Sequence, residues 1–201
     1  MPSATAGAPR VRPADVEAWF AALGLDPLER ADRTSIASWD FVLDGRRRFD
    51  LRVTVILDPA LGLICWAHYA PPISDLFRKS YRRLLRWNDE FPFAKFSVGD
   101  DERPQLAVEL TVEHASADAI GLALARIVGI ADALLDETRD WLWIGGRAPD
   151  RPVDFVAPTR GSHLIERYAH RLPELFEPAV EDLAGETAAD RDTADVWTMP
   201  A

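Results

Sequence analysis

Residues 48–57, RFDLRVTVIL, carry the pattern that decides the fold of this 201-residue chain. Polar and apolar side chains alternate through the stretch, and only Ile56 interrupts the alternation near its end. Alternation with a period of two predicts a β-strand with one face in the core and the other toward solvent. The face expected in the core consists of Phe49, Leu51, Val53, Val55 and Leu57.

Turn residues on both sides extend this strand into an antiparallel meander. Asp44-Gly45 precedes it and residues 58–62, DPALG, follow it, and both stretches are typical of tight turns. We therefore expect three strands, over residues 36–43, 48–57 and 63–69. The turn GDDERP, residues 99–104, separates two further expected strands, over residues 93–98 and 105–113.

Helical spacing of apolar residues predicts the remaining elements. Pro13 and Gly24 mark the start and the end of a first helix, and Ser116 caps the start of a long helix that ends near Glu137. Helices are also expected over residues 74–88 and 162–172. The fold class is therefore α+β, a single domain of order α-β-β-β-α-β-β-α whose antiparallel sheet is packed by helices, plus a C-terminal helical extension.

This order of elements divides the chain into four expected parts. They are a flexible N-terminus over residues 1–12, the domain over 13–137, a C-terminal arm and helix over 138–173, and an acidic disordered tail over 174–201.

Composition narrows the classes of function. The net charge of −10 comes from the second half of the chain, where residues 96–201 hold 9 Lys/Arg against 21 Asp/Glu. Nucleic-acid binding depends on Lys and Arg that neutralise phosphates, so we expect no nucleic-acid partner. No stretch is apolar enough to span a membrane, and the N-terminal residues lack a signal-peptide core. Cys65, the single cysteine, lies in an apolar run and suits a reducing compartment, so we expect a cytoplasmic protein with no membrane partner.

Catalytic and cofactor motifs are absent from the sequence. It contains no glycine-rich nucleotide loop, no metalloprotease motif and no nucleophile elbow, so neither a catalytic residue nor a cofactor is expected. His163, Glu166 and His170 fall on one face of the expected 162–172 helix, a spacing that could direct three ligands to one metal ion. We expect a solvated polar face here, with a metal-dependent enzyme as the alternative.

The end of the expected 74–88 helix, LLRWNDE over residues 84–90, raises the question of a carboxylate site. On a helical wheel Asn88 falls within the apolar face, whereas Asp89 and Glu90 fall outside it. Two exposed carboxylates lack the shared burial that acid–base chemistry requires. We therefore predict a structural role for Asn88, whose amide can bond helix carbonyls or an adjacent strand, or which can end the helix in the left-handed conformation.

The side of the sheet opposite the expected core carries a second apolar set. Ile56, Ile64 and Trp66 lie there among polar neighbours, with His68 beside them. An incompletely covered face with aromatic anchors is typical of a surface for a peptide or a second subunit. The alternative is that the C-terminal arm covers this face through Trp141, Trp143, Phe155 and Val156.

A strip of small residues marks the long helix. Gly121, Ala125 and Gly129 recur at every fourth position beside its apolar stripe. Glycine inside a helix costs about 1 kcal/mol relative to alanine, so such a strip indicates the close approach of another backbone. That backbone belongs either to this sheet or to another subunit, and the three residues are therefore candidates for partner binding.

Three segments carry a family resemblance: residues 81–98 (YRRLLRWNDEFPFAKFSV), 106–112 (LAVELTV) and 117–137 (ADAIGLALARIVGIADALLDE). In this order of elements the chain resembles the YbjN-like proteins, described as "putative bacterial sensory transduction regulators". The features that carry most of the resemblance are the helix end at Asn88, the strand from Phe93 to Val98 and the closing helix with Asp132. The resemblance covers about residues 13–137 and implies a fold similar to that of type III secretion chaperones.

The resemblance also implies a function. Domains of this kind are small, often dimerise, bind extended segments of client proteins without a cofactor, and are not known as enzymes. We therefore predict a non-enzymatic, chaperone- or regulator-like module that recognises a peptide segment of a client protein and forms a homodimer. The alternatives are the metal-dependent enzyme of unknown reaction and a structural subunit of a larger assembly, whose acidic tail docks on a basic partner.

Overall fold

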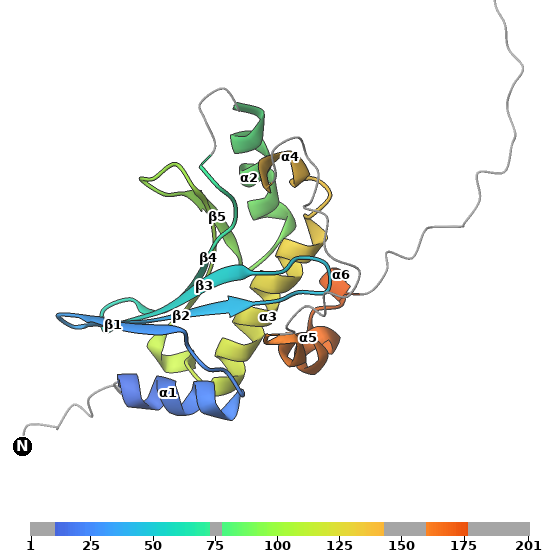
Figure 1. Cartoon of the computed structure of the whole chain (residues 1–201). Coiled ribbons are helices and arrows are strands. Elements are labelled where there is room, and N and C mark those ends of the chain that lie inside the picture. The colour runs from blue at the N-terminus through green and yellow to red at the C-terminus, as the bar shows by residue number, and fades with distance from the viewer. Residues whose placement is uncertain (1–10, 73–77, 143–159, 177–201) are drawn as a thin grey trace, which may run out of the picture.

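The computed structural model describes residues 11–72, 78–142 and 160–176. Its centre is a six-stranded antiparallel sheet of order β1-β2-β3-β4-β6-β5 (Figure 1). The strands are β1 (Glu29–Arg33), β2 (Ile36–Leu43), β3 (Leu51–Asp58), β4 (Gly62–His68), β5 (Lys95–Val98) and β6 (Pro104–Leu110). The helices are α1 (Pro13–Ala22), α2 (Arg78–Glu90), α3 (Ala117–Ala133), α4 (Arg139–Leu142), α5 (Ser162–Tyr168) and α6 (Pro173–Phe176).

The described helices cover one face of this sheet. Helix α3 packs against β4 and β6, and α1, α5 and α6 contact α3 in turn (Figure 1). Helix α2 reaches the same face through Trp87, whose ring meets those of Tyr69 and Phe96. Burial alternates along β3, where every second residue from Leu51 to Leu57 is buried and the residues between them are not. The predicted fold class, an α+β domain with an antiparallel sheet packed by helices and a helical C-terminal part, is confirmed.

The prediction for the strand around residues 48–57 was wrong at its start. Strand β3 begins at Leu51, because Asp50 adopts a left-handed backbone conformation with φ 58° and cannot continue an extended strand. Phe49 therefore lies in the β2–β3 loop, where it is half-buried, and not on a strand.

Strand β1 is an element that the sequence pattern did not indicate. All five of its residues are exposed, so it has no apolar side to reveal a period. Its backbone pairs with β2 from Glu29↔Asp40 to Arg33↔Ile36, across a tight turn in which Thr34 has φ 57°. Backbone pairing and an ion pair between Arg30 and Glu17 of α1 hold this strand, and amphipathicity is therefore a poor guide to it.

Helix boundaries follow the capping residues. Gly24, with φ 66°, follows the last turn of α1, and the Ser116 hydroxyl accepts a 3.1 Å hydrogen bond from the amide of Ala119 at the start of α3. Helix α3 ends at Ala133, four residues before the expected end at Glu137, and Leu134 caps it. Helix α5 ends at Tyr168, and a 3-10 turn, Ala169–Arg171, continues the chain.

Several expectations fall partly or wholly outside the described residues. These are the start of the 74–88 helix, the flexible N-terminus up to residue 10, the arm residues Trp143, Phe155 and Val156, the side chain of Trp141, and the tail from residue 177. Helix α6 occupies the first residues of the segment expected as the tail.

Candidate functional site

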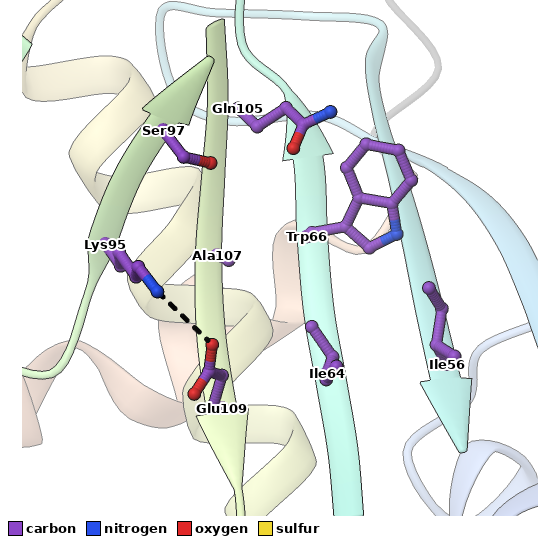
Figure 2. Close-up of a pocket in the computed structure, with 8 residues that line it drawn as sticks. All are labelled: Ile56, Ile64, Trp66, Lys95, Ser97, Gln105, Ala107 and Glu109. Atoms are coloured by element: carbon purple, nitrogen blue, oxygen red, sulfur yellow. Dashed lines mark ion pairs between the residues drawn. The ribbon is translucent and has the colours of Figure 1, made fainter. Parts of the chain in front are cut away.

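The face of the sheet opposite the helices forms the candidate site. We call it the open face and define it by the eight residues that line a shallow hollow of about 250 Å³ (Figure 2). They come from β3, β4, β6 and β5, in that order across the sheet: Ile56; Ile64 and Trp66; Gln105, Ala107 and Glu109; Lys95 and Ser97.

Strand register assembles this face from distant parts of the chain. The pairs Asp40↔Thr54, Thr54↔Trp66, Trp66↔Ala107 and Ala107↔Lys95 form one continuous row across five strands. A second row joins Ile56, Ile64 and Glu109. Since alternate residues of a strand share a face, the buried Cys65 and Ala67 on β4 place Trp66 outward. The predicted cluster of Ile56, Ile64, Trp66 and His68 therefore lies on one surface.

Trp66 is the largest side chain of the open face. Its indole leans from β4 toward β3, and the single methyl group of Ala107 lies on its other side (Figure 2). The ring of His68 meets the indole edge at a centroid distance of 4.6 Å. Trp66 Nε1 and His68 Nδ1 are shielded from solvent, and neither atom has a hydrogen-bond partner in the part of the chain that the structure describes. A buried donor left without an acceptor costs about 1–3 kcal/mol, so this position of the indole is unfavourable for the isolated chain.

Charges of both signs border the apolar centre. At one end of the row Thr54 Oγ1 donates a 2.5 Å hydrogen bond to the carboxylate of Asp40. At the other end Lys95 and Glu109 form a 4.0 Å ion pair between largely exposed side chains (Figure 2). Such exposed pairs contribute little to stability. Asp40 on β2 thus lies beyond the β3 side of the open face, and on the β5 side the charge of Lys95 is balanced by Glu109.

Both edges of the sheet disfavour the addition of a further strand. At the β5 edge the amide of Asn88 spans Phe96: Phe96 N donates to Asn88 Oδ1 at 2.6 Å, and Asn88 Nδ2 donates to Phe96 O at 3.2 Å. The side chain thus replaces a neighbouring strand at this residue. At the other edge β1 carries exposed charges, including Arg30 and Asp32, which disfavour strand addition. Asn88 therefore bonds the adjacent strand, one of the three alternatives that the sequence left open.

The small-residue strip of α3 contacts the chain's own C-terminal helices. A Cβ atom at Gly121 would lie 2.4 Å from the hydroxyl oxygen of Tyr168 in α5, and one at Gly129 would lie 2.7 Å from the ring of Phe176 in α6. Ala125, between them, is fully buried. The chain's own helices thus cover the strip, and not the sheet or a second subunit, the two neighbours that the sequence suggested. We therefore do not include Gly121, Ala125 and Gly129 in the partner surface.

The histidine set on α5 does not gather around one point. His163 Nε2 bonds the carbonyl oxygen of Leu23 at 2.7 Å, which identifies it as a donor to the α1 end. Because α5 stops at Tyr168, His170 leaves the helical face that it was expected to share with Glu166. Among the described residues no group of three His, Cys, Asp or Glu could hold a metal ion.

The β2–β3 loop contains a buried polar site that the sequence analysis missed. The carboxylate of Asp132, on α3, accepts hydrogen bonds from three consecutive amides, those of Arg46 at 2.6 Å, Arg47 at 3.1 Å and Arg48 at 2.7 Å. Gly45 packs directly against this carboxylate. Consecutive amides that converge on an anion form a backbone nest, and here the chain supplies its own anion. The loop is thereby fixed to the core helix.

Burial also controls the ionisable groups beneath the sheet. It lowers the pKa of Arg48, whose guanidinium lies over the Tyr69 ring and bonds the Tyr69 carbonyl. It raises the pKa of Tyr69 to about 12, and the phenol pairs with Thr138 at 3.1 Å. It raises the pKa of Cys65 to about 12 as well. A thiol with so high a pKa is unreactive near neutrality, so Cys65 is a core residue.

The fold and the candidate site together identify the structural class of the protein. The class is a small α+β domain with helices on one face of its sheet, an open face on the other, and no metal-binding cluster among its described residues. No described helix is long and apolar enough to cross a membrane.

The chain belongs to the YbjN family, described as "Putative bacterial sensory transduction regulator", whose family model matches residues 12–140. The match covers well over half of the 201 residues and confirms the family that segments 81–98, 106–112 and 117–137 indicated. In the comparison with curated proteins nothing matched the chain.

Proposed function

We propose that this chain is a non-enzymatic, regulator-like module that binds a peptide segment of a client protein on its open face. The observation that carries the proposal is the position of Ile56, Ile64 and Trp66, which remain partly exposed on a sheet face opposite the helices. An apolar centre with a polar rim is the usual composition of a protein-recognition surface. Tryptophan is also among the residues that most often supply the binding energy at such surfaces.

Because both edges disfavour strand addition, we expect binding across the face. Peptides that extend a sheet need a free row of backbone donors and acceptors along an edge strand. Asn88 occupies those groups at Phe96, and the other edge is charged. A client segment would therefore lie across the open face and contact Trp66 and Ala107 with its side chains.

The family and the expected likeness to type III secretion chaperones support the same class of function. The family description names a regulator and no reaction. We also propose that the protein acts in the bacterial cytoplasm and forms a homodimer. The competing possibility is that residues 143–159 of the same chain occupy the face.

A phage-displayed library of random linear peptides, selected on the purified full chain, tests this function. Peptides that bind the wild type should lose at least tenfold in affinity on Ile64→Lys, and they should bind Leu85→Lys normally. Leu85 is a matched control because it is an exposed leucine, 67% accessible, on α2 and away from the open face. The proposal fails if no peptide is selected, or if the selected peptides bind both variants equally.

A further inference from the structure

We infer that residues 177–201 of this chain dock on its own helix α2, through a surface that we call the basic face. We define the basic face by the five cations in the sequence of α2: Arg78, Lys79, Arg82, Arg83 and Arg86. The inference goes beyond the proposed function and is independent of it, because α2 packs on the helix-covered side of the sheet, away from the open face.

Helix α2 concentrates positive charge in a chain that is negative overall. Its residues 78–87 hold five Lys/Arg and no Asp or Glu, whereas the whole chain has a net charge of −10. Even with Asp89, Glu90 and the neighbouring Glu137 included, five cations stand against three acids. Cations are unfavourable in the first turn of a helix, and like charges one turn apart repel each other. An anionic segment on the basic face offsets both effects.

The described arginines of the basic face are accessible to such a segment. Arg82, Arg83 and Arg86 are all exposed. Arg83 Nη1 donates to the carbonyl oxygen of Glu137 at 2.8 Å, which leaves its charge without a carboxylate partner in this contact. Arg86 pairs with Glu90 at 3.1 Å, and such exposed pairs are weak. No hydrogen bond or ion pair joins Arg82 to another described residue.

Residues 177–201 supply the complementary charge. They hold seven Asp/Glu and one Arg, a net charge of −6, which is more than half of the net charge of the chain. Opposite charges on two surfaces steer the surfaces together and favour their contact. The segment also sets apolar residues beside its acids, as in residues 181–183, EDL. Leu85, which lies between Arg82 and Arg86 in α2 and is 67% exposed, provides an apolar contact within the basic face.

The segment begins close to the end of α2. Arg126 Nη1 donates to the carbonyl oxygen of Pro92, just after α2, at 3.2 Å, and to the carboxylate of Glu174, in α6, at 3.4 Å. At about 1.5 Å per residue, the 13 residues of α2 extend over about 20 Å. An extended chain spans about 3.3–3.6 Å per residue, so about ten residues after Phe176 reach along the whole helix.

A second arginine cluster, in the β2–β3 loop, lies near the same point but is already engaged. Each of its three arginines has a side-chain partner in the fold. In chain order these pairs are Arg46–Phe176, Arg47–Asp136 and Arg48–Tyr69. The exposed cations of α2 are therefore the better partner for residues 177–201.

Paramagnetic relaxation enhancement in NMR spectra of the full ¹⁵N-labelled chain tests this contact. A spin label is attached at Ala184→Cys, and the buried Cys65 does not compete for it. The label should weaken the amide signals of residues 82–86 by at least half at about 0.1 M salt, where the Debye length is about 10 Å. The effect should disappear at about 1 M salt, where the Debye length is about 3 Å.

Charge reversal on either side should remove most of the effect. The variants are Arg82→Glu/Arg86→Glu on α2 and Glu181→Lys/Asp182→Lys on the segment. The second variant leaves α2 unaltered, so its result does not depend on the stability of that helix. Arg52→Glu, the same reversal at an exposed position of β3, is the matched control and should leave the effect unchanged.

Three results would overturn the inference. The first is no weakening of the α2 signals at low salt, and the second is weakening centred instead on open-face residues such as Ile64 and Ala107. The third comes from a mixture of spin-labelled chains without ¹⁵N and ¹⁵N-labelled chains without the spin label. Equal weakening of the α2 signals in that mixture would mean that the segment docks on another molecule and not on its own helix.

Discussion

Replacement of Asp132 should destabilise the fold far more than replacement of any surface carboxylate. Its side chain is 6% exposed and accepts three amide hydrogen bonds from the β2–β3 loop. A hydrogen bond to a charged group contributes about 1.5–3 kcal/mol, but the loop lies at the surface, where water can satisfy part of what is lost. We therefore expect Asp132→Ala to lower the free energy of unfolding by about 3–5 kcal/mol.

Asp132→Asn should be an intermediate case. Oδ1 accepts from Arg47 and Arg48, whereas Oδ2 accepts from Arg46. An asparagine keeps one acceptor oxygen and places its amino group against the third amide, so we expect a loss of about 2 kcal/mol.

Urea denaturation of wild type and both variants measures these free energies. For a protein of this size, 1 kcal/mol corresponds to about 2–4 °C in melting temperature, so Asp132→Ala should melt at least about 6 °C lower. Asp136→Ala is the matched control. Its carboxylate lies one turn away and pairs with Arg47 and Arg139 at the surface, so its removal should cost less than about 1 kcal/mol. If Asp132→Ala and Asp136→Ala lost equal stability, the loop would not depend on the buried carboxylate.

The remaining predictions concern the sheet edge, the helix strip and the buried acids. Asn88→Leu should lower the free energy of unfolding by about 1–3 kcal/mol through the loss of both backbone bonds to β5, measured by urea denaturation. Unchanged stability with lost peptide binding would instead make the residue a binding site. Gly121→Ala should cost about 1–3 kcal/mol in the same assay, because the new methyl group meets the Tyr168 hydroxyl at 2.4 Å and its ring carbon Cε2 at 2.6 Å. A smaller cost of Gly121→Ala in a Tyr168→Ala background would identify that side chain as the cause. Burial raises the pKa values of Cys65 and Tyr69 to about 12, so on a rise in pH the unfolded state loses these protons before the folded state does. The free energy of unfolding should therefore fall from about pH 9 toward pH 12. Tyr69→Phe should make this dependence on pH less steep in denaturation curves recorded across that range.

Local patterns of the sequence predicted the elements whose residues face a core, and long-range contacts account for the rest. The alternation in residues 48–57 located β3, since burial of one face leaves a period in the sequence. Strand β1 has no such period because it is exposed on both sides. The contact between Asp132 and the loop joins residues 84 to 86 positions apart, a distance at which one sequence contains no periodic signal.

The sequence likewise predicted only part of the candidate site. The outward position of Trp66 followed from strand alternation, because Cys65 and Ala67 had to face the core. Its neighbours Thr54 and Ala107 could not be predicted, since they depend on which strands pair and in which register. The glycine strip indicated the close approach of another backbone, but the atoms that approach α3 belong to side chains, those of Tyr168 and Phe176 in the C-terminal helices. A pattern on one helix specifies that it has a neighbour without specifying which element that is.

The two faces of the sheet have different physical requirements, and this difference bears on function. On the buried face Trp87 and Trp39 are about 1–2% exposed and fill the core, so their size is explained by packing. On the open face Trp66 is flanked by the small side chains of Thr54 and Ala107 and holds an unsatisfied indole donor. Folding alone requires no such residue there, because a smaller polar side chain would suit a solvated strand and avoid the cost of the donor. This contrast is the reason why Trp66 stands at the centre of the surface that we propose for a partner.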